Sequence, residues 1–108
     1  MITIKKVLLL SIKTEYANKI FDGSKKYEYR RKSIGEHNIG NKILIYSSGK
    51  DKAVIGYIIV NEILKGNIEH ILEKTNKQNE DNIINYFKNC ENCFAFKIGK
   101  TYLFKNKI

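Results

Sequence analysis

The sequence contains no proline and no tryptophan, and only two of its 108 residues are cysteines. A fold based on a disulfide framework is therefore not expected. The longest apolar run, residues 7–10, is far too short to cross a bilayer, and the N-terminal residues lack the pattern of a secretory signal. These absences lead us to expect a cytoplasmic protein with no membrane segment.

The motifs of several common enzyme classes are also missing. The sequence has no Ser–His–acid spacing, no phosphate-binding loop and no dinucleotide fingerprint. Cys90 and Cys93 form a C-x-x-C pair, but between an expected helix and an expected strand, whereas a redox pair usually opens a helix. His37 and His70 are isolated, so we expect neither a metal site nor a cofactor, and Cys93 is expected in the core.

Positive charge is concentrated in the first third of the chain. Lys and Arg number 20 and Asp and Glu 11, which gives 20 − 11 = +9. Residues 1–32 carry nine cations and three anions, a surplus of six, so the remaining 76 residues contribute only +3. A concentrated basic region is typical of a site for a polyanion, most plausibly a nucleic acid. The alternative is a lysine-rich surface that is simply solvated.

The hydrophobic pattern predicts an α+β fold in which strands dominate, and no linker or repeat divides the chain. We therefore expect a single domain over residues 1–108. The expected strands are residues 7–12 (buried on both faces), 25–32, 42–47, 53–64 (with a bulge or bend at Gly56), 93–98 and 101–105. The expected helices are residues 15–21, capped by Thr14, a short one capped by Asn67, and one that starts at Asn79 or Asp81 with Ile83, Ile84 and Phe87 inward. This order favours a mainly antiparallel, closed sheet with short flanking helices.

Residues 25–32 have an unusual composition for a strand. One face would be wholly charged and include Glu28 and Arg30, while the other would carry Tyr27 and Tyr29, which we expect in the core. Charged groups facing a partly closed barrel need partners. Glu28 and Arg30 could pair with each other and only stabilise the barrel. Alternatively, Arg30 could bind a phosphate or a base edge and Glu28 could accept from an exocyclic amine.

Two segments carry a resemblance to a known family. Gly23, Lys25, Glu28 and Arg30 form a Gly-x-Lys-x-x-Glu-x-Arg motif after the first expected helix. The second segment is the sequence Tyr46-Ser47-Ser48 followed by Val54-Ile55-Gly56. Both patterns resemble the ASCH domain family, and the similarity extends to Tyr86-Phe87 and to residues 95–98. The chain departs from the family at Thr14 and Gly49, where members often have proline.

The resemblance implies a PUA-like β-barrel with a basic cleft beside the first helix, and binding of RNA or action on modified nucleosides. The expected nucleic-acid-binding residues are Ser11, Lys13, Lys25, Glu28, Arg30, Arg31, Tyr46, Ser47 and Ser48. The lysines would contact phosphates, Tyr46 could stack on a base, and the serine hydroxyls could hold a phosphate or carbonyl oxygen. An ordinary turn explains the two serines nearly as well. We expect RNA rather than DNA as the partner, a monomer, and a regulatory role, for instance in transcription.

Catalysis is the alternative to simple binding. Some compact ASCH relatives are amidohydrolases of acetylated cytidine, with a Lys at the position of Lys25 and a Thr three residues on. Here Glu28 occupies that second position, so the threonine nucleophile is missing, although Glu28 could act as a general base for water. Lys25 and Glu28 would be the catalytic residues of such an enzyme. A ribonuclease, in which cations stabilise a phosphorane, and a protein-interaction module are further alternatives.

Overall fold

The computed structural model describes residues 7–77 and 80–108. Its strands are β1 (Leu8–Lys13), β2 (Tyr27–Arg30), β3 (Lys42–Ser48), β4 (Ala53–Gly66) and β5 (Cys93–Leu103). Its α-helices are α1 (Thr14–Phe21), α2 (Ile68–Lys74) and α3 (Glu80–Tyr86), and a short 3₁₀ helix spans Glu36–Asn38.

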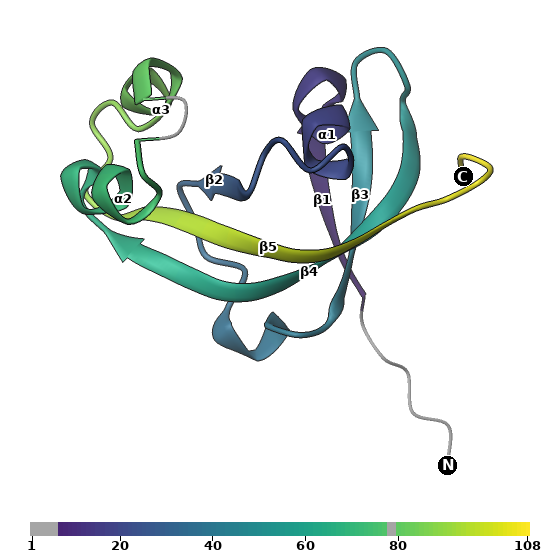
Figure 1. Ribbon diagram of the computed structural model, residues 1–108, viewed down its shortest axis with the longest axis horizontal. Coiled ribbons are helices and arrows are strands. Elements are labelled where there is room, and N and C mark those ends of the chain that lie inside the picture. Colours follow the sequence, from purple (N-terminus) through teal and green to yellow (C-terminus); the bar gives the residue numbers. More distant parts are fainter. Residues whose placement is uncertain (1–6, 78–79) are drawn as a thin grey trace.

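The five strands form one mixed sheet in the order β1-β3-β4-β5-β2. Only the β1–β3 pair is parallel, and the pairs β3–β4, β4–β5 and β2–β5 are antiparallel. The sheet curls into a half-barrel, with β1 and β2 as its two edges (Figure 1). The predicted α+β fold with a mainly antiparallel, barrel-like sheet is thus confirmed, but the sheet is not closed as expected, because its edge strands β1 and β2 do not pair with each other.

The long strands β4 and β5 span the molecule and connect its two ends. Helix α1 lies with β1 and β3 at one end, and α2 and α3 lie at the other (Figure 1). The register of β3 and β4 shifts beside Gly56, which confirms the bulge predicted there. A Cβ atom at Gly56 would collide with the carbonyl oxygen of Tyr102 and the ring of Phe21, so only glycine lets the strands and α1 approach so closely.

The described part of the chain has two clusters of buried apolar side chains. The larger joins α1 to the inner face of the sheet and contains Leu10, Ile12, Ala17, Ile20, Ile43, Ile45, Ile55, Ile58, Val60 and Phe96. The smaller joins α2 and α3 to β5 and contains Ile71, Leu72, Ile83, Phe87, Cys93 and Ala95. Cys93 is fully buried, which confirms its predicted core position, whereas Tyr27 and Tyr29 are only half-buried against the edge of this cluster.

Several expectations about the N-terminal elements were wrong. Strand β1 is buried on one face only, and Leu9 is 46% exposed, because no described helix packs on the outer face of this strand. Thr14 is the first residue of α1 and not its cap, because its hydroxyl donates to the Ser48 carbonyl instead. Strand β2 is shorter than residues 25–32, because Lys25 turns inward and its N–H donates to the Lys19 carbonyl at the end of α1 (2.9 Å).

The C-terminal part has one strand where two were predicted. Strand β5 continues through Gly99, which has no side chain and therefore leaves room for the side chain of Asn61. Ile84, predicted to point inward, is 45% exposed, because the helix directs Ile83 and Phe87 to the core instead. The predicted cap Asn67 is confirmed by its bond from the His70 N–H (2.9 Å), whereas Asn79 lies outside the described residues.

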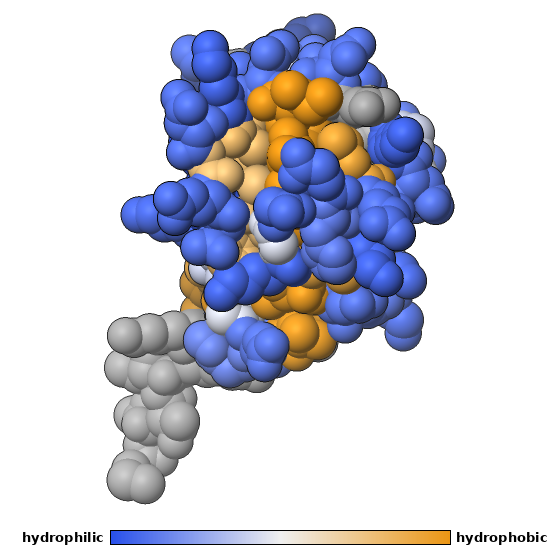
Figure 2. Space-filling view, turned by 90° about the vertical axis from the view of Figure 1, so that its left-hand side faces the viewer, coloured by the Kyte–Doolittle hydropathy of each residue, from blue (hydrophilic) through white to orange (hydrophobic). Residues whose placement is uncertain are grey.

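Figure 2 views the molecule from the side of α2 and α3. The surface there is mostly hydrophilic, with hydrophobic patches between the polar side chains. No helix in the described ranges is long and apolar enough to cross a membrane.

Candidate functional site

A pocket of about 310 Å³ opens between the two edges of the half-barrel. Four elements line it: β1, α1, β2 with the residues just before it, and α3. The lining residues are Ser11, Ile12, Lys13, Tyr16, Lys25, Glu28, Tyr29, Arg30, Asn82, Ile83 and Tyr86. The cleft predicted beside the first helix therefore exists, and it contains five of the nine expected binding residues.

A buried carboxylate held between two cations lines this pocket. The Oε1 atom of Glu28 lies 3.4 Å from Nζ of Lys25, and its Oε2 atom lies 2.9 Å from Nε of Arg30. The side chains of Lys25 and Glu28 are 6% and 8% exposed, and that of Arg30 is 27% exposed. We call these three residues the ion triad. It carries one net positive charge, because two cations face one anion.

Lys25 is the most unusual member of the triad, because a lysine is rarely buried. Its ammonium group also donates to the Tyr27 carbonyl and lies 4.9 Å from the centre of the Tyr29 ring. Burial lowers the pKa of Lys25 below its usual value, and the nearby Glu28 carboxylate opposes that shift. Burial likewise raises the pKa of the Tyr29 phenol.

Arg30 connects the two edges of the sheet. It lies on β2, and its Nη2 atom donates to the carbonyl oxygen of Ser11 on β1 at 2.7 Å. A guanidinium group has five N–H donors, and the bonds to Glu28 and Ser11 use two of them. Arg30 therefore joins the edges and retains donors for a ligand. Ser11 contributes its backbone rather than its hydroxyl.

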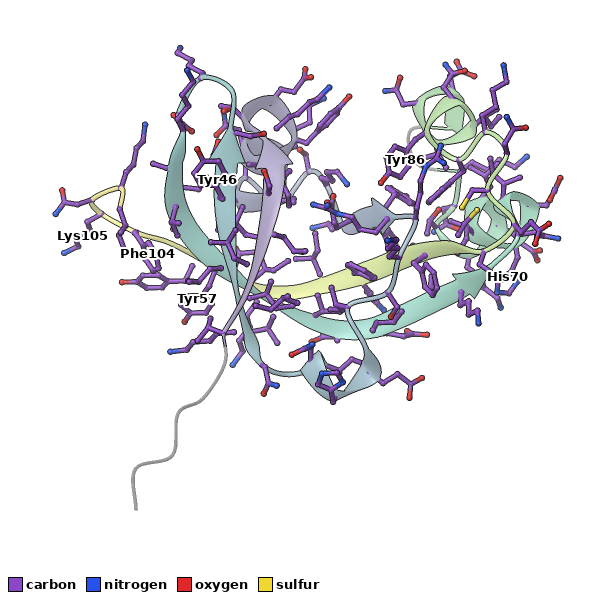
Figure 3. The ribbon with its side chains drawn as sticks, turned by 180° about the vertical axis from the view of Figure 1, so that it is seen from behind. Tyr46, Tyr57, His70, Tyr86, Phe104 and Lys105 are labelled. Atoms are coloured by element: carbon purple, nitrogen blue, oxygen red, sulfur yellow. The ribbon has the colours of Figure 1, made fainter. Side chains whose placement is uncertain are left out.

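The rim of the pocket is cationic and aromatic. Lys13 is exposed at the end of β1. Tyr16 on α1 and Tyr86 at the end of α3 also line the pocket, and Tyr86 is 42% exposed. Figure 3 shows Tyr86 on the same side of the sheet as α3.

Arg31 lies outside the pocket and stabilises its wall. Its guanidinium donates to the Tyr86 carbonyl (2.6 and 3.2 Å) and to the Lys88 carbonyl (3.3 Å), and it lies 5.7 Å from the Tyr86 ring centre. These bonds connect the end of β2 to the end of α3.

The Tyr-Ser-Ser segment is likewise outside the pocket lining. The buried Ser47 hydroxyl donates to the Asp51 carboxylate (2.9 Å) and lies 2.8 Å from the Thr14 hydroxyl. The Ser48 carbonyl accepts from Thr14 at 2.8 Å, and Tyr46 pairs with Ser11 across β1 and β3. The two serines thus connect the turn between β3 and β4 to the start of α1.

Sequence reasoning did not identify the contribution of α3, which supplies Asn82, Ile83 and Tyr86, or that of Tyr16. In the sequence, only the resemblance of Tyr86-Phe87 to the family pattern pointed to α3, and that resemblance assigned no function to either residue. Among the described residues, no group of His, Cys, Asp and Glu side chains is arranged to hold a metal ion.

Comparison with known proteins places these observations in a family. The sequence profile of the ASCH domain matches residues 10–101. Two mutant proteins of ASCH from Zymomonas mobilis have similar structures. One has 23% identity and a TM-score of 0.83 over 96% of this chain and 76% of its own. The other has 24% identity and a TM-score of 0.82 over 93% and 71%.

A further structure of ASCH from Zymomonas mobilis has 24% identity and a TM-score of 0.78 over 88% of this chain and 68% of its own. At this identity the likeness concerns the fold. A comparison with curated proteins finds no significant match. Since the family profile covers most of the sequence, the chain belongs to the ASCH domain family, a PUA-like family of nucleic-acid-binding domains.

Proposed function

We propose that this protein binds RNA in the pocket between β1, α1, β2 and α3, as a monomeric regulatory domain of the cytoplasm. The observation that carries the proposal is the ion triad, which lines the pocket with two cations for one anion. Transfer of these charges from water is costly unless they gain partners, and a phosphate group is a suitable additional partner.

The roles of the individual groups follow from their exposure. Arg30 offers a planar fork of donors to a phosphate or to a base edge, whereas the buried Lys25 holds Glu28 in place. Lys13, at the rim, is a point charge for a neighbouring phosphate. Tyr16 and Tyr86 present aromatic rings on facing walls, where an unpaired base can stack.

Unpaired RNA fits these features better than duplex. The pocket has a volume of about 310 Å³ and lies between two strand edges, whereas a duplex presents a broad surface of phosphates. Sequence-specific recognition of RNA generally uses splayed bases of single-stranded segments.

The test is fluorescence anisotropy with labelled single-stranded RNA, duplex RNA and single-stranded DNA across a salt series. The variants are Lys13→Ala, in the pocket rim, and Lys32→Ala, which changes another exposed lysine outside the pocket lining. We expect Lys13→Ala to weaken RNA binding and reduce the salt slope by about one phosphate contact, with Lys32→Ala close to wild type. Equal binding by both variants and wild type would contradict the proposal.

One observation favours a second candidate, hydrolysis of a modified nucleoside. The lowered pKa of Lys25 makes its neutral amine more accessible, and the adjacent Glu28 carboxylate can accept a proton. The test is incubation with acetylated cytidine and with RNA, followed by chromatography. Release of acetate that is lost in Lys25→Met would establish this candidate, RNA cleavage would indicate a ribonuclease, and unchanged substrates would leave binding as the function.

A further inference from the structure

A second group of aromatic side chains lies on the outer face of the sheet, opposite the face that α1 covers. Tyr57 on β4 and Tyr102 on β5 are register partners, and their rings stack with centres 5.4 Å apart and planes inclined by 12°. Phe104 packs at an angle against both, at 6.3 and 6.0 Å. Figure 3 shows Tyr57 and Phe104 near the C-terminal segment, on the other side of the sheet from Tyr86.

The stack is open at one end. Tyr102 is 51% exposed although Tyr57 stacks on one of its ring faces and Phe104 packs against it at an angle, so part of the ring is accessible to a ligand. Strand β2 pairs with β5 only over the residues Phe94 to Lys97, so no described strand flanks Tyr102 on that side. A flat ligand could therefore lie on Tyr102 and continue the stack.

The other end of the stack is occupied by a cation. Nζ of Lys42 lies 5.0 Å from the centre of the Tyr57 ring. Because β3 and β5 flank β4 on opposite sides, Lys42 and Tyr102 approach Tyr57 from opposite directions. Phe104 contacts both tyrosine rings, so the three side chains pack against one another.

Apolar contact extends from the stack across the sheet. Leu9, Leu44, Tyr57 and Tyr102 are consecutive register partners on β1, β3, β4 and β5. Leu9 is 46% exposed and Tyr102 51% exposed, so the row is accessible at both ends. Exposed apolar side chains in such an arrangement indicate an interaction site.

The charge of this face determines the kind of partner. Lys100 shares the outer face with Tyr102, two residues further along β5, and Lys105 lies next to Phe104 (Figure 3). Residues 42–48, 53–61 and 98–105 contain no aspartate or glutamate. A second copy of the chain would bring these lysines together, whereas a polyanion complements them.

We propose that this aromatic platform, formed by Tyr57, Tyr102 and Phe104 with Lys42 and Lys100, binds the unpaired bases of single-stranded nucleic acid. One base stacks on the accessible part of the Tyr102 ring, and the adjoining phosphates contact the lysines. The platform lies outside the pocket and does not depend on it. Stacking uses the π-face that all bases share, so RNA and DNA bind here alike, in contrast to the pocket.

The test compares Tyr102→Ala and Tyr102→Phe by fluorescence anisotropy with labelled oligouridylate and oligothymidylate. Loss of one base stack weakens binding by about 5- to 150-fold, so we expect that change for Tyr102→Ala with both oligomers. Tyr102→Phe keeps the ring and should stay within about twofold of wild type. Leu103→Ala is the matched control, because Leu103 is 57% exposed on the same strand and has no ring.

The contributions of the pocket and of the platform to binding are distinguished by repeating Tyr102→Ala in a Lys13→Ala background. An undiminished effect of Tyr102→Ala supports the platform even if the pocket binds nothing. The proposal is overturned if Tyr102→Ala binds both oligomers as wild type does, or if Tyr102→Phe loses as much affinity as Tyr102→Ala. It is also overturned if wild type self-associates in sedimentation and Tyr102→Ala abolishes that association, because the face would then be a protein interface.

Discussion

Replacement of Glu28 by glutamine tests the ion triad most directly. The change keeps the size of the side chain and removes the one negative charge between Lys25 and Arg30. Loss of one partner from a buried ion pair costs about 3–5 kcal/mol, because the remaining charge is left uncompensated. The triad borders an open pocket and Arg30 is 27% exposed, so we expect the lower end, about 3 kcal/mol.

The same variant has a predictable pH dependence. In the wild type, burial already lowers the pKa of Lys25 below its usual 10.5, while Glu28 partly restores it. Without Glu28 that pKa falls further. Between the folded and the unfolded pKa, the unfolded chain holds a proton that the folded chain has released, so the free energy of unfolding rises with pH. Glu28→Gln should therefore recover stability as the pH rises toward 10.5, over a wider range than wild type does.

The assay is urea unfolding followed by circular dichroism, at neutral pH and at a series of alkaline pH values. A loss of about 3 kcal/mol corresponds to a fall in melting temperature of about 12–24 °C for a domain of this size. The control is Glu62→Gln, which removes an exposed carboxylate from β4. A loss below about 1 kcal/mol for Glu28→Gln, or no recovery at alkaline pH, would refute the reasoning about a compensated buried charge.

Three further predictions concern single side chains. Arg30→Ala should lower the melting temperature and RNA affinity more than Lys32→Ala, because only Arg30 joins the two sheet edges; equal small effects in calorimetry and anisotropy would contradict this. Ser47→Ala should cost about 0.5–1.5 kcal/mol in urea unfolding, since it removes the bonds of a fully buried hydroxyl while Thr14 keeps the Ser48 carbonyl and Asp51 keeps Lys107; an unchanged midpoint would contradict this. Burial raises the pKa of the Cys93 thiol to about 11, so iodoacetamide at pH about 8 should label Cys90 first in mass spectrometry, and preferential labelling of Cys93 would contradict this.

The sequence predicts the chemistry of the site well where the relevant geometry is local. Glu28 and Arg30 are two residues apart on a strand, and that spacing alone places their side chains on one face, where they pair. The same rule fails for Lys25, which alternation groups with the tyrosines. It lies just before β2 begins, where the backbone still bonds to the end of α1, and its side chain turns toward Glu28.

Features that depend on contacts between distant parts of the chain could not be predicted from the sequence. The position of α3 across the pocket follows from packing of Ile83 and Phe87 on β5, and no local pattern encodes which wall Tyr86 completes. The edge position of β1 could not be predicted either, since its apolar run is equally compatible with burial on both faces. Ser47 and Thr14 contact each other although they are far apart in the sequence. Local propensities for caps and turns do not reveal such a contact.

The bond between Arg30 and the Ser11 carbonyl has a consequence for how a ligand enters. A closed barrel is sealed by a ladder of backbone bonds that yields only when many break together. Here a side chain joins β1 to β2 in the described region, through the bond from Nη2 of Arg30 to the Ser11 carbonyl. A ligand that uses the remaining donors of Arg30 leaves this bond in place, whereas a ligand that takes the Nη2 donor displaces the Ser11 carbonyl and frees the two edges of the sheet to separate.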